Sequence, residues 1–244
     1  MFFKSKTLFG LFLGFIGMGI SAQDLNFKGV LPMWNQTGNI SPKFNYNFTI
    51  YPTFDVLDES VQGMSYPKTT LQLYVQPSLI YLLNAQWQMA VSYTYQRNNP
   101  INERYSNEHR LWQQSSFMHN IEKGQISHRV RMEERFIQNR ADDSYPLSTR
   151  LRYQMACMVP LEGPSLEAKE YYFNSYNEFF FSLSGQRNAL YSDNWTYLGI
   201  GYHLGDLGRI ELGYLLQNAI RNPAGDHRYL HLLQMAWFSN FRFW

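Results

Sequence analysis

The chain has 244 residues, with 21 Lys and Arg against 19 Asp and Glu, and 17% of its residues are aromatic. This near balance of charge excludes the basic surface that binds nucleic acid, and a single cysteine, Cys157, excludes an internal disulfide. The length suits one domain, and no low-complexity tract or repeat divides it.

The N-terminus has the pattern of a secretory signal peptide. Lys4 and Lys6 precede a short apolar run, and small residues lead to Ala22. Because glycines interrupt the run and it is short for a membrane-spanning helix, we predict cleavage after Ala22 rather than a retained anchor. Residues 1–22 are then the signal peptide, and residues 23–244 form a mature domain with 19 basic and 19 acidic side chains.

Residues 23–42 precede the first clear strand. A strand near 27–34 makes eleven in total, which breaks the even strand number of bacterial barrels, so we expect a periplasmic or lumenal lead-in. A barrel of twelve strands is the alternative, and it requires one further strand within residues 52–69.

Ten later segments alternate apolar and polar residues, as a β-strand with one apolar face does. In the clearest, apolar side chains take every second position from Trp87 to Tyr95. This stretch spans about 26 Å along the strand and about 20 Å in height at a tilt near 40°, close to the ~25 Å apolar band of an outer-membrane barrel. The ten predicted strands are 43–51, 70–82, 86–96, 108–119, 125–136, 148–159, 169–183, 195–204, 209–217 and 229–244.

The connections alternate in length, as the short periplasmic turns and longer outer loops of such barrels do. The expected inner turns are 83–85, 120–124, 160–168 and 205–208, and the expected outer loops are 52–69, 97–107, 137–147, 184–194 and 218–228. The sequence therefore predicts an all-β, antiparallel transmembrane β-barrel of about ten strands, with twelve as the alternative.

The last strand ends in Trp244 and resembles the C-terminal signal read by the outer-membrane assembly machinery. Together with the signal peptide and the aromatic content, it predicts a protein exported to a Gram-negative outer membrane. Its expected partners are the lipid bilayer, lipopolysaccharide and that machinery, and the oligomeric state stays open.

Charged side chains gather on one face of the predicted strand 125–136. A lipid-facing arginine costs about 2–4 kcal/mol at the midplane, so this face must line the lumen. The predicted lumenal network comprises Arg129, Arg131, Glu133, Arg135, Arg150, Arg152, Glu178 and Glu211. Either it fills a narrow barrel, which we favour, or it forms a cationic constriction that selects anions. Glu134 has lipid-facing parity, so we expect a bulge there or a position near the outer rim.

Catalysis is the weaker hypothesis. A lipid hydrolase needs a serine beside a histidine, and Ser92 with His109 on neighbouring strands is the candidate pair. A protease needs clustered acids and a histidine above the barrel, where 142–143 and 226–227 lie. The histidines show no metal-ligand spacing, and no cofactor motif is present. We therefore expect a structural barrel or narrow, porin-like pore, with surface adhesion or ligand binding by the outer loops as the alternative.

Several short motifs together resemble an uncharacterised family of outer-membrane barrels, classed as a domain of unknown function. Over roughly residues 85 to 244, the motifs are His128–Phe136, Arg150–Tyr153, Val159–Leu161, Asn177–Phe180, Gly199–Tyr202 and Glu211–Tyr214. The resemblance implies the fold and the location, and it assigns no activity.

Overall fold

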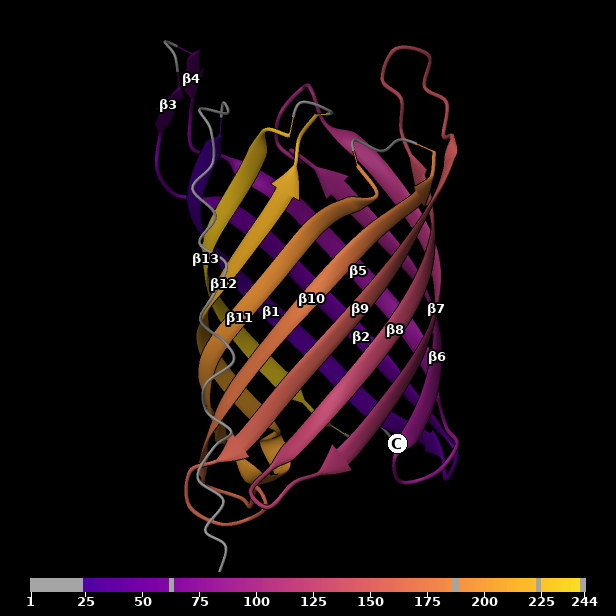
Figure 1. Cartoon of the computed structure of the whole chain (residues 1–244), viewed down its shortest axis with the longest axis vertical. Helices are drawn as coiled ribbons and strands as arrows, with labels where there is room; N and C mark the ends of the chain where they lie inside the picture. Colours follow the sequence, from indigo (N-terminus) through magenta and orange to yellow (C-terminus); the bar gives the residue numbers. More distant parts are fainter. Residues whose placement is uncertain (1–23, 62–63, 186–188, 223–224, 242–244) are drawn as a thin grey trace, which may run out of the picture.

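The computed structural model describes residues 24–61, 64–185, 189–222 and 225–241, and within them eleven strands close into a barrel (Figure 1). No helix in these ranges is long and apolar enough to cross a membrane. The barrel strands are β1 (Leu25–Ser41), β2 (Phe44–Asp55), β5 (Thr70–Leu82), β6 (Trp87–Asn98), β7 (Ser106–Asn120), β8 (Gln125–Ile137), β9 (Leu147–Pro160), β10 (Tyr171–Ser184), β11 (Tyr191–His203), β12 (Arg209–Ile220) and β13 (His227–Ser239).

The first strand corrects the predicted number. β1 occupies most of the predicted lead-in, and it pairs with β2 on one side and β13 on the other. Its inward face carries Leu25, Phe27 and Leu31; the exposed Asn26 and Lys28 alternate with them at the start, whereas from Val30 to Trp34 both faces are apolar. The alternative of a twelfth barrel strand within residues 52–69 is also wrong. The two short strands there, β3 (Glu59–Val61) and β4 (Met64–Tyr66), pair with each other and not with the barrel.

An odd number of antiparallel strands leaves the first and last running in the same direction. β1 and β13 therefore close the barrel as a parallel pair, in register from Leu25 opposite Arg228 to Gln36 opposite Ser239. Side chains tie this seam near its lower end, where Trp34 Nε1 donates to Ser239 Oγ at 2.7 Å and Gln36 Nε2 donates to the carbonyl of Phe241 at 2.9 Å.

The seam predicts one specific cross-link. In a Cys157→Ser background, the pair Val30→Cys and Leu233→Cys should form a disulfide on mild oxidation, because these residues are direct register partners. Pairing Val30→Cys with Tyr214→Cys is the matched control, since Tyr214 lies one strand further away, opposite Leu233. A gel shift resolves the cross-linked form, and equal cross-linking of the two pairs would contradict the eleven-strand closure.

The connections fall at the ends that the sequence predicts. At the upper end of Figure 1 lie the β3–β4 hairpin and four further connections, and at the lower end lie three short turns, the longer connection 161–170 and the 3-10 turn η1 (Gly205–Leu207). The start of β1 lies at the upper end and the end of β13 at the lower end. The C-terminal aromatic signal and the signal peptide lie outside the described residues.

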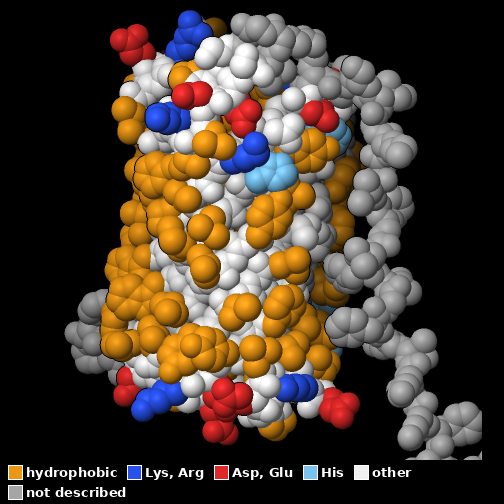
Figure 2. Space-filling view, turned by 90° about the vertical axis from the view of Figure 1, so that its left-hand side faces the viewer, with side chains coloured by type: hydrophobic (Ala, Val, Ile, Leu, Met, Phe, Trp, Pro, Cys, Tyr) orange, Lys and Arg blue, Asp and Glu red, His pale blue; other side chains and the backbone are white. Residues whose placement is uncertain are grey.

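The outside of the barrel is apolar. Along β6, Trp87, Met89, Val91 and Tyr93 are each 41–53% exposed, while the residues between them face the lumen. Figure 2 shows hydrophobic side chains across the middle of one face, with Lys, Arg, Asp and Glu at its upper and lower ends. Glu134 does face outward, and it lies three residues from the upper end of β8, where Gln113 donates to it at 3.2 Å.

The lumen has two unlike walls. One, which we call the apolar wall, is a cluster of buried apolar residues on β1, β2, β5 and β11 to β13, beside which polar side chains of the same strands also face the lumen. The members of the cluster are Leu25, Phe27, Leu31, Tyr51, Tyr74, Tyr197, Leu215, Leu230 and Leu232. The other, the charged wall, is formed by β7 to β10 and carries the arginines and glutamates described next.

Candidate functional site: the charged lumen

Glu133 lies at the centre of the charged wall and has no exposed surface. Arg150 on the next strand lies 2.7 Å from one carboxylate oxygen, and Arg152 lies 2.8 Å from the other. Arg110 on β7 is 3.5 Å away and Arg131 is 3.9 Å away. A buried carboxylate is stable only when cations and donors compensate its lost hydration, and here arginines from three strands do so.

Two further glutamates extend the network along the wall. Glu108 on β7 pairs with Arg110 at 2.6 Å and with Arg135 at 2.7 Å. Glu178 on β10 pairs with Arg152 at 2.8 Å. It also accepts a hydrogen bond from Arg129 at 2.6 Å. The three carboxylates therefore alternate with arginines in one connected chain across β7 to β10.

Three guanidinium groups of the network, those of Arg131, Arg150 and Arg152, lie over aromatic rings. Arg131 stacks on Trp112 with 3.8 Å between the guanidinium carbon and the ring centre, and Arg152 lies 4.3 Å from the centre of Phe180. Such contacts stabilise a desolvated cation in addition to its carboxylate partners. The network is therefore rigid, with its side chains held from several sides.

Seven of the eight predicted network residues lie together on the charged wall. The sequence reasoning missed Glu108 and Arg110, which bridge Arg135 to Glu133. A signal was present, because Glu108, Arg110 and Trp112 alternate along one strand with the same inward parity.

Glu211 is the eighth, and it lies apart from the arginines. Tyr172 and Tyr197 donate to its carboxylate at 2.8 and 3.2 Å, and Asn174 donates at 3.1 Å. Glycines make this possible: a Cβ at Gly199 would collide with the Tyr197 ring, and the absence of one lets the ring lie against the barrel wall. Neutral tyrosine and asparagine donors, rather than arginines, therefore hold this carboxylate.

Cavities lie below and above the network. The lower one, which we call the lower cavity, has a volume of about 390 Å³, and two upper ones of about 140 and 550 Å³ share most of their lining. Tyr51, Tyr74, Arg152 and Trp195 line both the lower cavity and the smaller upper one, so they form the layer between them. The rings of Tyr51 and Tyr74 stack at 4.5 Å in this layer.

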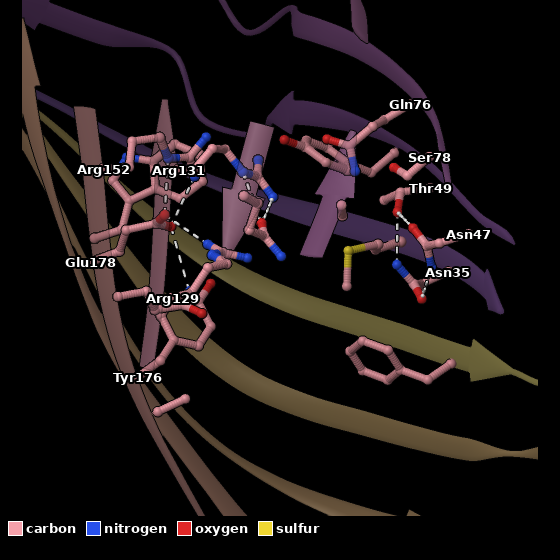
Figure 3. A pocket seen from close by; sticks show the side chains of 18 of the residues that line it. Asn35, Asn47, Thr49, Gln76, Ser78, Arg129, Arg131, Arg152, Tyr176 and Glu178 are labelled. Atoms are coloured by element: carbon pink, nitrogen blue, oxygen red, sulfur yellow. Dashed lines mark hydrogen bonds and ion pairs between the residues drawn. The ribbon is translucent and has the colours of Figure 1, made fainter. Parts of the chain in front are cut away.

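Figure 3 shows the lower cavity from close by. Arg152, Arg131, Arg129 and Glu178 stand on one side, and the amide and hydroxyl side chains of β1, β2 and β5 stand on the other. The cavity therefore lies between a charged surface and a neutral polar one.

The structure does not bring Ser92 and His109 together. Ser92 is buried in the lumen, where it bonds to Ser78, whereas His109 faces outward and bonds to Tyr93 at 2.5 Å. In the upper loops, Ser144 donates to Asp142, which lowers the pKa of that carboxyl group and closes an ordinary turn. Within the described residues, no group of three or more His, Cys, Asp or Glu side chains is placed to hold a metal ion.

Comparison with known proteins identifies the family of the chain. The profile of a family described as "Protein of unknown function (DUF2490)" matches residues 31–228, well over half of the chain. The chain belongs to this DUF2490 family. No curated protein and no solved structure matches the chain.

The DUF2490 match begins inside β1, so the resemblance seen in the sequence from residue 85 onward was too short at its N-terminal end. The matched residues 31–228 include every residue of the charged network and of the Glu211 site. Since the DUF2490 family has no assigned function, the match supplies no activity, and the geometry alone must suggest one.

Proposed function

We propose that the protein is an integral outer-membrane barrel whose lumen is closed near mid-height, a structural barrel rather than an open pore. The observation that carries this is the inverted distribution of side chains: Glu133, Glu178 and Arg152 are buried inside, while Val91 and Met89 are more than half exposed outside. In water this arrangement leaves far more apolar surface exposed than a soluble monomer tolerates, whereas a bilayer covers it.

Aromatic pairs at two heights support a bilayer between them. Near the lower end, Trp87 packs on Phe117 with 4.8 Å between ring centres, and Tyr171 packs on Tyr202 at 4.7 Å. Nearer the upper end, Tyr214 bonds to His231 at 2.6 Å on the outer surface. Aromatic side chains with a polar tip favour the membrane–water interface, so the two heights correspond to the two interfaces.

In this proposal the lower end faces the periplasm, and the long upper connections face lipopolysaccharide and the cell exterior. The assembly machinery that inserts other outer-membrane barrels inserts this one. The connected charged wall and the layer at Tyr51 and Tyr74 favour a filled lumen, because they leave separate cavities in place of one channel.

Substituting arginine at two exposed apolar positions tests the membrane location. Val91→Arg, at the centre of the outer face of β6, should destabilise the barrel in phospholipid vesicles by about 2–4 kcal/mol. Ile101→Arg is the matched control, because Ile101 is 81% exposed in an upper connection and should tolerate the charge within about 0.5 kcal/mol. Urea unfolding in vesicles measures both, and a neutral Val91→Arg variant would contradict the proposal.

A further inference from the structure

We infer that the lower cavity binds a small organic anion that carries hydroxyl groups, of the sugar-acid class. This inference goes beyond the closed barrel, and it depends on the cavity and not on the membrane location. It follows from unused donors on the charged wall, from the polar groups opposite them, and from the charge, size and position of the cavity.

Two arginines of the lower cavity keep unused hydrogen-bonding capacity. Arg131 donates from Nε and Nη2 to a single neutral acceptor, Gln114 Oε1, at 3.0 and 2.8 Å, and its nearest recorded carboxylate, that of Glu133, is 3.9 Å away. Arg129 donates to Glu178, but its buried Nε has no acceptor among the described residues. A buried donor left unsatisfied is costly, so these groups favour an anionic oxygen in the cavity.

The carboxylate that Arg129 contacts, that of Glu178, is already engaged. Glu178 accepts two hydrogen bonds from Arg152, at 2.9 and 2.8 Å, in addition to the one from Arg129. Glu211, the other acid lining the cavity, is held by tyrosine and asparagine donors. Three arginines and two glutamates line the cavity, which leaves an excess of one positive charge for a ligand to balance.

The opposite side of the cavity suits hydroxyl groups. Asn47 donates to Asn35 at 2.9 Å, and Asn35 donates to Thr49 at 2.7 Å, so these side chains form an ordered row. Gln76 accepts from Tyr74 through its oxygen, which leaves its amide nitrogen for a ligand, and Ser78 lies beside it in Figure 3. Rigid amides and hydroxyls that both donate and accept match the hydroxyl groups of a sugar.

Size and access agree with a small ligand. The volume of about 390 Å³ lies in the range of roughly 300–1,000 Å³ that is usual for small-molecule sites. Two lining residues, Ile80 and Gln88, lie within two residues of the lower ends of β5 and β6, so the cavity extends toward that end of the barrel. The layer at Tyr51 and Tyr74 bounds it above.

Calorimetric titration of the folded full-length protein in detergent tests the inference. Sodium glucuronate should bind at least about tenfold more tightly than glucose, which lacks the charge, and than acetate, which lacks the hydroxyl groups. Arg131→Gln should weaken glucuronate binding about tenfold or more. Arg140→Gln, at an exposed loop residue that does not line the cavity, is the matched control and should leave binding unchanged.

A second variant keeps the test decisive if Arg131→Gln fails to fold. Gln76→Glu preserves the side-chain size and adds a negative charge opposite the arginines, so it should abolish glucuronate binding in a barrel that still shows heat-modifiable migration on a gel. No glucuronate binding to the wild type, equal binding of glucose, or unchanged binding in whichever cavity variant folds would each overturn the inference.

Discussion

Replacing Glu133 by alanine is expected to lower the free energy of unfolding of the barrel by about 3–5 kcal/mol. The reason is that Arg150 and Arg152, each less than a tenth exposed, lose the carboxylate that lies 2.7–2.8 Å from them. Arg110 then keeps the Glu108 carboxylate and the neutral acceptor Gln96 as partners. Urea unfolding of the refolded barrel, followed by tryptophan fluorescence, measures the loss.

The neighbouring acid supplies the control. Glu134→Ala removes a carboxylate of the same type on the same strand, but one that faces outward and is contacted by Gln113 at 3.2 Å. It should change the free energy of unfolding by no more than about 0.5 kcal/mol. If the two alanine variants were equally stable, the buried network would not hold the charged wall together.

The second large effect is expected on ion flux. The double variant Tyr51→Ala, Tyr74→Ala removes the stacked rings that separate the lower cavity from the upper ones. The resulting channel should carry chloride faster than potassium, because Arg135, Arg150 and Arg228 line the upper cavities with Asp193 as their acidic neighbour. Chloride entry into vesicles loaded with a chloride-sensitive dye should rise by at least an order of magnitude.

The control variant for this flux removes two tyrosines from the outer surface. Tyr93→Ala with Tyr214→Ala leaves the lumen intact, since both side chains face away from it and bond to histidines. Its chloride flux should equal that of the wild type. A rise in both double variants would point to general loosening of the barrel, and no rise in the lumenal variant would place the barrier elsewhere.

Strand positions could be predicted from the sequence wherever one face is apolar and the other polar. The stretch from Trp87 to Tyr95 is the clearest case, and it lies within β6 with the expected faces. A strand near 27–34, which lies within β1, was set aside because it makes the strand number odd. Excluding an eleventh strand on the grounds of even number was wrong, because a parallel seam closes an odd barrel equally well.

The charged wall was predictable in position but not in its pairs. The inward parity of Arg129, Arg131 and Glu133 follows from their spacing on one strand and the cost of charge in lipid. Which carboxylate pairs with which arginine depends on the register of neighbouring strands and on the length and rotamer of each side chain. The spacing of residues along one strand predicts neither. This is why the sequence could not show that tyrosines, rather than arginines, contact Glu211.

The proposal of a membrane barrel with a closed lumen is tested most directly by single-channel recording of the wild-type protein in planar bilayers. We predict insertion without stepwise conductance, with discrete steps only after Tyr51→Ala and Tyr74→Ala are introduced. Stable, uniform conductance steps from the wild type would contradict the account, because they require a continuous aqueous path through the layer formed by Tyr51, Tyr74, Arg152 and Trp195.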